Sequence, residues 1–446
     1  MMLNKQIKTM AKVIFNTFNP EFVKGVAQET GFQQRTGKLK PEAFLVLCTL
    51  LKNSIGKNSL PNLCSAIGYQ FKTSISKQAL NERFNAKAVS FLKKMYHQLS
   101  DQQEGIPSLI EKHALFSRIR IMDATSFRLP KDYEDYPGIQ GNGVKVQLEY
   151  EYLEGKFLYH SVDPETRSDK DAARELIKSE RLGDLILRDL GFYSASIINE
   201  IFKSEASLIT RVPSQTKFWT GNPNEGWTQI KPEEDLKDEE PGEIVDYGFI
   251  KVGGDKRSSV MARVVAQKLT ADQRKSRDRA LKLKRQKGHQ TLSAQERNNI
   301  QILVTNITQE NLEAQDLYPL YTLRWQIEIL FKTWKSLFEV DEVRKMKQER
   351  FECHLYGTLI EILLSSMLAF QCRLYLYRDY QLEASEYKCI DLAKEALPHL
   401  ITAVQTGKEN LITILEILYE NARKHGKKDH RKSHVSPFDV LGIPYK

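Results

Sequence analysis

Residues 320–336 read LYTLRWQIEILFKTWKS, a segment in which polar side chains recur with the spacing Y-x2-R-x3-E-x6-K. The residues with this spacing are Tyr321, Arg324, Glu328 and Lys335. At about 100° per residue on an α-helix, they fall on one narrow stripe. Apolar side chains gather on another face, as in a helix packed against a core. These are Leu323, Ile327, Leu330, Phe331 and Trp334. The segment therefore predicts one helix with a carboxylate, two cations and a phenol along one side.

The charged stripe has two interpretations. A carboxylate flanked by cations on a rigid helix suits a site that holds a metal ion and grips phosphate groups. The alternative is a solvated helix face on which Arg324 and Glu328 form an ordinary i,i+4 ion pair. The helix alone favours neither interpretation, so the rest of the chain has to decide between them.

The composition is typical of a globular protein that binds a polyanion. The chain has 446 residues, of which 41% are hydrophobic and 28% charged, and its formal net charge is +9 at pH 7. That length is enough for several domains, and the basic balance favours nucleic acid as a partner. The five cysteines are scattered without a C-x-x-C pair. This pattern indicates reduced thiols in a cytoplasm and argues against a structural zinc site.

No segment is predicted to carry the chain to a membrane or anchor it there. The N-terminus, MMLNKQIKTMAKVIF, lacks the apolar run and cleavage site of a signal peptide. The most apolar helix is expected at about residues 354–370; it contains Glu361 and is short for a membrane span. We therefore expect a buried core helix and a cytoplasmic, nucleoid-associated protein.

Residues 1–110 are predicted to be helical. Pro41 opens one helix, and a second short helix is expected at about residues 60–67, broken by Gly68. Ser76 is a plausible N-cap for a third helix. A helix, a short turn and a helix are compatible with a helix-turn-helix DNA reader, with a plain helical bundle as the alternative. The candidate reading residues are Lys77, Gln78, Asn81 and Arg83.

From about residue 117 the pattern changes to alternating strands and helices. Strands are expected at residues 117–130, in two runs within 145–162 that turn at 154–155, and at 184–189 and 207–211; helices are expected at 171–177 and 195–202. The order β-β-β-α-β-α-β implies a mixed sheet with helices packed on its faces.

Residues 213–300 interrupt this order with loops and strand-like runs, and end in a strongly basic helix. That helix either contacts a phosphate backbone or is simply solvated. The region from residue 373 is expected to be helical with a basic tail. The tail histidines are set aside as metal ligands because no cysteine lies near them; they are His425, His430 and His434.

Two aspartates stand out at the expected strand ends. Asp123 follows Ile121 and Met122, and Asp189 follows an apolar strand. A carboxylate there is costly unless it is paired or binds a metal, although either residue could instead cap a turn. Asp184 is a rival second acid, but it lies at the start of its strand. Carboxylate clusters that cut phosphodiesters hold two divalent ions, for which Mg²⁺ is suited and Mn²⁺ is a substitute.

Several motifs together carry a resemblance to a known family. They are Asp-Ala-Thr-Ser at 123–126 in the strand 119–127, Gly-Val-Lys-Val-Gln at 143–147, Arg-Asp-Leu-Gly-Phe-Tyr at 188–193, Val-Thr-Asn-Ile at 304–307 and the Tyr321–Lys335 signature. In this order they resemble the DDE transposases of bacterial insertion sequences, in the subgroup that carries this signature, the insertion sequence four family. The match covers roughly residues 40 to 370. Leu190 departs from the family, which often has a basic residue after the second acid.

The resemblance implies an α/β fold with a ribonuclease-H-like, mixed-sheet catalytic core, split by a β-rich insertion and flanked by helical regions. The expected domains are a helical DNA-binding region (1–110), the first part of the core (111–212), the insertion with its basic helix (213–300), the second part of the core (301–372) and a helical C-terminal region with a basic tail (373–446).

The resemblance also assigns the site. Asp123, Asp189 and Glu328 would form the catalytic, metal-binding triad with two Mg²⁺ ions. The expected DNA contacts are Tyr321, Arg324 and Lys335, with Trp325 either stacking on a base or packing in the core, of which packing is favoured. The implied partners are double-stranded DNA, both element ends and target, and a second copy of the chain in a dimer that holds two ends. A hairpin intermediate is implied as well.

The predicted function is cut-and-paste transposition by metal-dependent strand cleavage and joining. Two rivals are a transposase-derived DNA-binding regulator that no longer cuts, and a structure-specific nuclease on the same fold. The intact set of acids argues against the regulator, since clustered acids are costly to keep. The Tyr321–Lys335 signature argues against a generic nuclease, which has no need of it.

Overall fold

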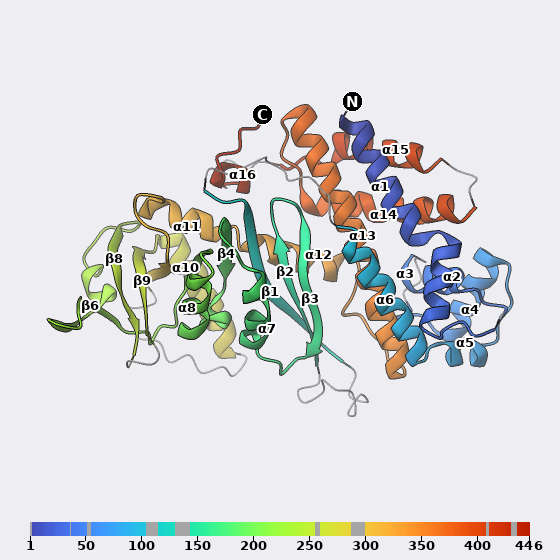
Figure 1. Cartoon of the computed structure of the whole chain (residues 1–446), viewed down its shortest axis with the longest axis horizontal. Helices are drawn as coiled ribbons and strands as arrows, with labels where there is room; N and C mark the ends of the chain where they lie inside the picture. The colour runs from blue at the N-terminus through green and yellow to red at the C-terminus, as the bar shows by residue number, and fades with distance from the viewer. Residues whose placement is uncertain are drawn as a thin grey trace.

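The computed structural model describes residues 2–35, 37–50, 55–103, 115–129, 143–254, 259–286, 299–406, 410–429 and 435–446. An all-helical part lies beside a large mixed sheet that has helices on both faces (Figure 1). This arrangement confirms the predicted α/β class.

The N-terminal region is helical, as predicted. Its helices are α1 (Met2–Phe18), α2 (Pro20–Glu29), α3 (Pro41–Thr49), α4 (Leu60–Phe71), α5 (Lys77–Arg83) and α6 (Ala86–Asp101). Ser76 caps α5, as expected, by accepting a hydrogen bond from the Ala79 amide. The predicted break at Gly68 is wrong, because α4 continues to Phe71. One glycine costs a helix only about 1 kcal/mol, and the burial of Leu63 and Ile67 offsets that.

Ten strands of the described chain form one sheet, in the order β3-β2-β1-β4-β5-β10-β9-β8-β6-β7. The core strands are β1 (Arg118–Arg128), β2 (Gly143–Glu151), β3 (Lys156–Pro164), β4 (Asp184–Arg188), β5 (Ser207–Arg211) and β10 (Ile300–Thr305). β1 pairs antiparallel with β2 and parallel with β4, and β4 pairs parallel with β5. This is the mixed sheet expected of a ribonuclease-H-like core.

The insertion extends this same sheet. Its strands are β6 (Phe218–Asn222), β7 (Gly226–Ile230), β8 (Ile244–Gly253) and β9 (Ser259–Lys268). β9 pairs with β10, which pairs on its other side with β5. The described residues of the insertion also include two helices, the short α9 (Pro232–Asp235) and the basic α10 (Ala271–Gln286). The insertion is therefore continuous with the core through β10.

Helices cover both faces of the sheet. On one face lie α7 (Asp169–Leu176), the 3-10 turn η1 (Ile177–Ser179) and α8 (Ala195–Lys203). On the other lie α11 (Ala314–Thr322), α12 (Trp325–Ser336) and α13 (Gln348–Tyr380). Alternate residues of a strand point to opposite faces. Accordingly, Ile121 packs with the α12 side and Met122 with the α7 and α8 side.

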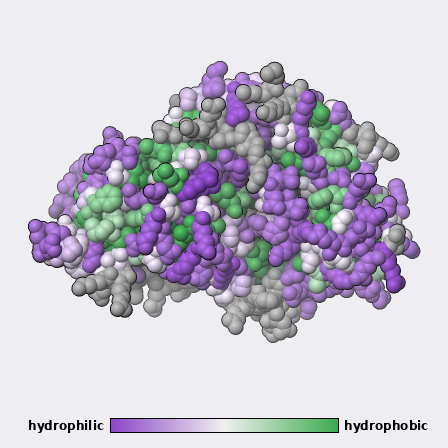
Figure 2. Space-filling view, in the orientation of Figure 1, coloured by the Kyte–Doolittle hydropathy of each residue, from purple (hydrophilic) through white to green (hydrophobic). Residues whose placement is uncertain are grey.

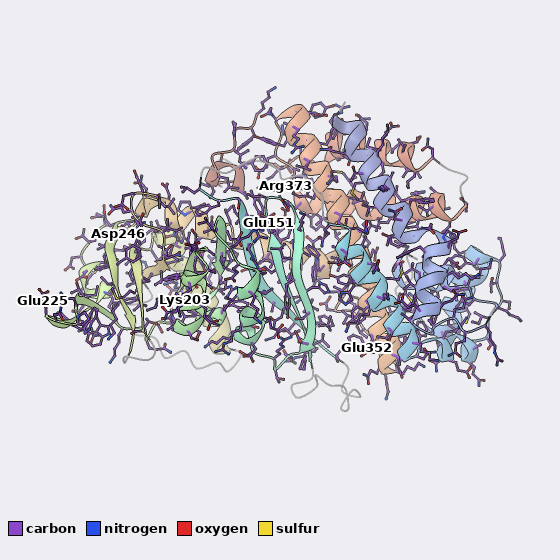
Figure 3. The ribbon with its side chains drawn as sticks, viewed as in Figure 1. Glu151, Lys203, Glu225, Asp246, Glu352 and Arg373 are labelled. Atoms are coloured by element: carbon purple, nitrogen blue, oxygen red, sulfur yellow. The ribbon has the colours of Figure 1, made fainter. Side chains whose placement is uncertain are left out.

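The long helix α13 joins the helical part to the sheet. It has 33 residues, about twice the predicted length, and it is apolar enough to cross a membrane by composition alone. However, 94% of its most apolar window is buried inside the protein, so the expected core helix is confirmed. Arg373 donates to the Tyr152 carbonyl at 3.0 Å and lies beside Glu151 at the end of the β2–β3 hairpin (Figure 3).

The C-terminal helices complete the helical part. They are α14 (Glu386–Thr406), α15 (Leu411–His425) and α16 (Pro437–Val440). α1 packs against α14 and α15, so the two ends of the chain share one core (Figure 1). His425 ends α15, whereas His430 and His434 lie outside the described residues. Hydrophilic residues cover most of the face shown in Figure 2, with apolar side chains in separate small areas.

Candidate active site

The parallel pairing of β1 with β4 brings the first two acids together. The last paired residues are Met122 on β1 and Arg188 on β4, so Asp123 and Asp189 occupy the next positions on neighbouring strands. Asp123 lies in the middle of β1, not at its end as predicted, because β1 runs on to pair with β2. β4 itself stops at Arg188, and Asp189 begins the 3-10 turn η2 (Leu190–Phe192).

The signature segment forms two helices instead of the predicted one. α11 ends at Thr322, and Arg324 is the N-cap of α12. Tyr321 therefore belongs to α11, while Glu328 and Lys335 belong to α12. The apolar stripe is confirmed, since all its members are buried: Leu323, Ile327, Leu330, Phe331 and Trp334. The break between the helices places the side chain of Arg324 over the end of the strand pair.

Arg324 bridges two of the acids. Its Nη2 donates to Oε1 of Glu328 at 2.7 Å, and its Nη1 lies 3.4 Å from Oδ2 of Asp123. The Arg324 side chain is 5% exposed, and the two carboxylates are about a quarter exposed. The Coulomb attraction in such a buried ion pair is stronger than in a solvated one, but burying the two charges also carries a desolvation cost. The i,i+4 ion pair expected of a solvated helix face is present, but it lies among the acids and not on an exposed surface.

The second acid, Asp189, is contacted by a phenol. Tyr321 is buried, and its hydroxyl donates to Oδ1 of Asp189 at 3.3 Å. Burial, together with the charge of Asp189, raises the pKa of Tyr321, so the phenol stays protonated and remains a donor.

Lys335 and Trp325 extend the site along α12. Lys335 Nζ donates to the main-chain carbonyl of Ser126 on β1 at 3.2 Å. The favoured expectation that Trp325 packs in the core is wrong, because the residue is 53% exposed. The Arg324 guanidinium carbon lies 5.3 Å from the centroid of a Trp325 ring. Trp325 is therefore about half exposed, with the bridging arginine over one of its rings.

The environment of Asp123 shifts its proton equilibrium. Burial raises the pKa of Asp123 to about 6, and the charges of Asp189 and Glu328 act in the same direction. The Ala124 amide, at 2.8 Å from Oδ1, and the Arg324 guanidinium oppose the rise. Crowded carboxylates with a shifted pKa are typical of a functional site.

The rival acid Asp184 has a different environment. It is fully buried at the opposite end of β4, and its carboxylate pairs with Arg118 at 2.6 Å and Arg120 at 3.0 Å. Arg120 also pairs with the buried Glu149 at 2.6 Å. Asp184 thus belongs to a buried ion network that the sequence analysis missed. In the sequence, the network is marked by the alternation of arginine with apolar residues in RIRIM (118–122). The same pattern is typical of a strand with one face in solvent, so it does not reveal the buried ion pairs.

A further member of this network lies next to the site. Arg188, which precedes Asp189, is buried and donates to the Glu180 carboxylate at 2.5 Å. A buried pair of this kind fixes the end of β4, because breaking it would leave an uncompensated charge.

Carboxylate oxygens are the ligands that divalent ions such as Mg²⁺ prefer. Among the residues that the structure describes, no three His, Cys, Asp or Glu side chains converge closely enough to hold an ion. The triad provides a suitable donor set, but Arg324 now occupies the space between Asp123 and Glu328.

Comparisons with known proteins identify the class. A family model described as "Transposase DDE domain" matches residues 114–364. The chain belongs to the DDE transposase family, and it is therefore an enzyme that cleaves DNA and transfers the cut strands. This confirms the family expected from the signature.

Among individual proteins, the chain is similar to the transposase for insertion sequence element IS231F of Bacillus thuringiensis subsp. israelensis. The two are 33% identical over 100% of this chain and 97% of that protein. The transposase for insertion sequence element IS1151 of Clostridium perfringens is 29% identical over 99% of this chain and 97% of its own length. A solved piggyBac transposase synaptic complex with hairpin DNA aligns with a TM-score of 0.43 and 12% identity, covering 96% of this chain and 87% of that one.

Proposed function

We propose that the protein cuts DNA at the inverted-repeat ends of its own insertion sequence and joins the freed ends to target DNA. The catalytic acids in this proposal are Asp123, Asp189 and Glu328. The observation that carries the proposal is the register of β1 with β4, which sets Asp123 beside Asp189, with Glu328 joined to Asp123 through Arg324.

DDE transposases use divalent metal ions, and we propose two Mg²⁺ ions here, with Mn²⁺ as a substitute. When bound, such ions supply an activated nucleophile and stabilise the leaving oxygen. The three carboxylates would hold them. Arg324 would have to release Asp123 or Glu328 first, since its guanidinium contacts both. Phosphate groups of the DNA are then its natural new partners, because a guanidinium binds them bidentately.

The remaining signature residues would position the element end. Lys335 would contact a phosphate, and Tyr321 would hold Asp189 in place through its hydroxyl. Trp325 would stack on an unpaired base, because its open indole is the surface that such bases use.

The helical N-terminal region offers a separate place for DNA. A groove of about 880 Å³ runs between the α2–α3 connection and α5. Among the described residues lining it, four are basic and none is acidic; the basic ones are Arg35, Lys38, Arg83 and Lys87. Lys77 and Gln78 on α5 are exposed, as a reading helix requires, whereas Arg83 is held by the Leu39 carbonyl at 2.9 Å. We propose that this region recognises the element ends.

Three further points complete the proposal. Two copies of the chain would hold two element ends in one complex, and cleavage would pass through a hairpin. The protein would act in the cytoplasm, at the nucleoid. We also propose domain boundaries near residues 110, 212, 300 and 372.

The test is cleavage of a duplex that carries an element end, with Mg²⁺ or with a chelator. Asp123→Asn, Asp189→Asn and Glu328→Gln should each abolish nicking and keep binding of the end. Glu200→Gln, an exposed carboxyl on α8, is the matched control. Nicking at wild-type rates in any of the three would remove that acid from the triad. Specific binding without cutting by the wild type would favour the regulator, and cutting without preference for ends would favour the nuclease.

A further inference from the structure

A hollow of about 480 Å³ opens on the α7 and α8 face of the sheet, away from α11 and α12. Its polar lining comes from the first turn of α7, from the segment that leads into α8, and from the connection between β5 and β6. The residues that provide it are Lys170, Tyr193, Ser194, Gln215, Thr216 and Lys217. Two segments of the core and one of the insertion therefore meet in this hollow.

The hollow is cationic. Among the described residues that line it there is no carboxylate, and Lys170 and Lys217 are both exposed. In the part of the chain that the structure describes, neither lysine side chain has a carboxylate partner. Asp169, the acid next to Lys170, is engaged by Lys145 at 3.0 Å. Asp171 pairs with Arg174 at 3.1 Å. Within the described ranges, both positive charges are therefore available to an anion from outside.

The backbone that lines the hollow is held in place relative to Asp189. Tyr193 follows η2, the turn that starts at Asp189 and is closed by the Phe192 amide donating to the Asp189 carbonyl at 3.0 Å. Phe192 is buried, so this turn is anchored in the core. On the other side, the Gly253 amide donates to the Lys217 carbonyl at 2.9 Å and holds that backbone.

Strand joining requires two DNA molecules to meet at the acids. The residues proposed to hold the element end, Arg324, Lys335 and Trp325, lie on the α12 side of the sheet. The hollow lies on the opposite face of the sheet, where Tyr193 follows Asp189 by four residues. It offers two ammonium groups that have no carboxylate partner among the described residues, together with neutral hydrogen-bonding groups. Ammonium groups with neutral donors are how proteins position a DNA backbone without reading its sequence.

We propose that this hollow binds phosphates of the target duplex and aligns it with the acids from the face opposite to the element end. The inference rests on the proposed strand-transfer function and extends it by assigning a second DNA site. Because Lys170 and Lys217 act here as phosphate contacts, their effect is electrostatic and uniform across target sequences.

The experiment compares the Lys170→Ala/Lys217→Ala variant with a matched control, Lys178→Ala/Lys203→Ala. The control lysines are exposed and lie outside the hollow, Lys203 near the far end of α8 (Figure 3). Pre-cut element ends are joined to a plasmid at increasing plasmid concentration. The hollow variant should need about tenfold more target for half-maximal joining, while the control matches the wild type. End cleavage should fall much less than joining.

A binding measurement separates this inference from the proposed function. Anisotropy of a labelled duplex without an element end, followed against salt, needs no catalysis. Loss of two phosphate contacts should reduce the slope of log K against log salt by about two. An unchanged slope and unchanged joining would overturn the inference, as would equal losses of end binding and target binding. Failure of the wild type to cleave, with the slope change present, would count against the proposed function alone.

Discussion

The Nη1 atom of Arg324 lies 3.4 Å from Oδ2 of Asp123, although 201 residues separate the two in the sequence. The same guanidinium binds Glu328. A cation of the chain thus occupies the space between two carboxylates proposed to hold divalent ions, and it offsets their mutual repulsion in the DNA-free protein.

Arg324→Gln should therefore strengthen metal binding by the DNA-free protein while weakening catalysis. Removing the competing cation is expected to tighten Mn²⁺ binding several-fold, up to about tenfold. Isothermal titration measures the affinity, and the fluorescence of the neighbouring Trp325 gives a second signal. Lys332→Gln, an exposed cation on α12, is the control. Equal Mn²⁺ affinity in wild type and Arg324→Gln would contradict the competition.

The raised pKa of Asp123 predicts opposite pH dependences of activity and stability. At limiting Mg²⁺, cleavage should fall as pH drops through about 6, because a proton then competes with the metal ion for Asp123. The folded-state pKa exceeds the unfolded value of about 3.9, so the folded protein binds more protons between these values. In metal-free protein, stability should thus decrease as pH rises from about 4 to 6.

Asp123→Asn tests the stability half of this prediction. It should raise the free energy of unfolding by about 1–2 kcal/mol at pH 7 and have little effect at pH 4. Urea unfolding in chelator at both pH values measures this. A destabilised variant at pH 7 would show that the pairing of Asp123 with Arg324 outweighs the desolvation of its carboxylate.

Tyr321→Phe should slow cleavage without unfolding the protein. The variant keeps the buried ring and loses only the hydroxyl that donates to Asp189. One hydrogen bond to a charged group is worth about 1.5 kcal/mol, which corresponds to a rate loss of about tenfold. Single-turnover cleavage and the melting temperature are measured together, beside Tyr318→Phe as a control. A tenfold loss in both variants would point to a general packing effect.

Asp184 and Asp189 should respond in opposite ways to substitution. Asp184→Asn breaks buried pairs with Arg118 and Arg120, and should lower the free energy of unfolding by about 3–5 kcal/mol. Asp189→Asn should leave stability within about 1 kcal/mol and abolish cleavage. Denaturant titrations and nicking assays on both variants show which aspartate is structural and which is catalytic. A stable but inactive Asp184→Asn would reverse the assignment.

The sequence predicted the parts of the fold that depend on local periodicity. The apolar stripe of residues 323–334 and the succession of core strands and helices along the chain follow from side-chain spacing, and the cap at Ser76 follows from its residue type. The break at Arg324 could not be predicted, because residues 321–325 contain neither glycine nor proline. The contacts of Arg324 with Asp123 and Glu328 that accompany the break are seen only in the folded protein.

The buried charges were missed for a related reason. A charged residue on a strand is ordinarily assigned to solvent, and only the partner strand shows that Arg120 faces Glu149 and Asp184 inside the protein. The position of Asp123 within β1 was missed as well. The pairing of β1 with β4 ends at Met122, whereas its pairing with β2 continues to Arg128, and a single sequence does not show where each pairing ends. Trp325 lies at the edge of the apolar stripe, where spacing alone does not settle exposure.

The pairing of β10 between β5 and β9 makes the insertion hard to delete. Every residue of β10 is buried, and its sequence IQILVT is mostly apolar. Excision of the strands β6 to β9 would leave β10 as an exposed apolar edge strand, whose unpaired backbone groups can pair with another chain and cause aggregation. A shortened transposase built on this scaffold would therefore need a replacement edge strand, so the insertion is no detachable module.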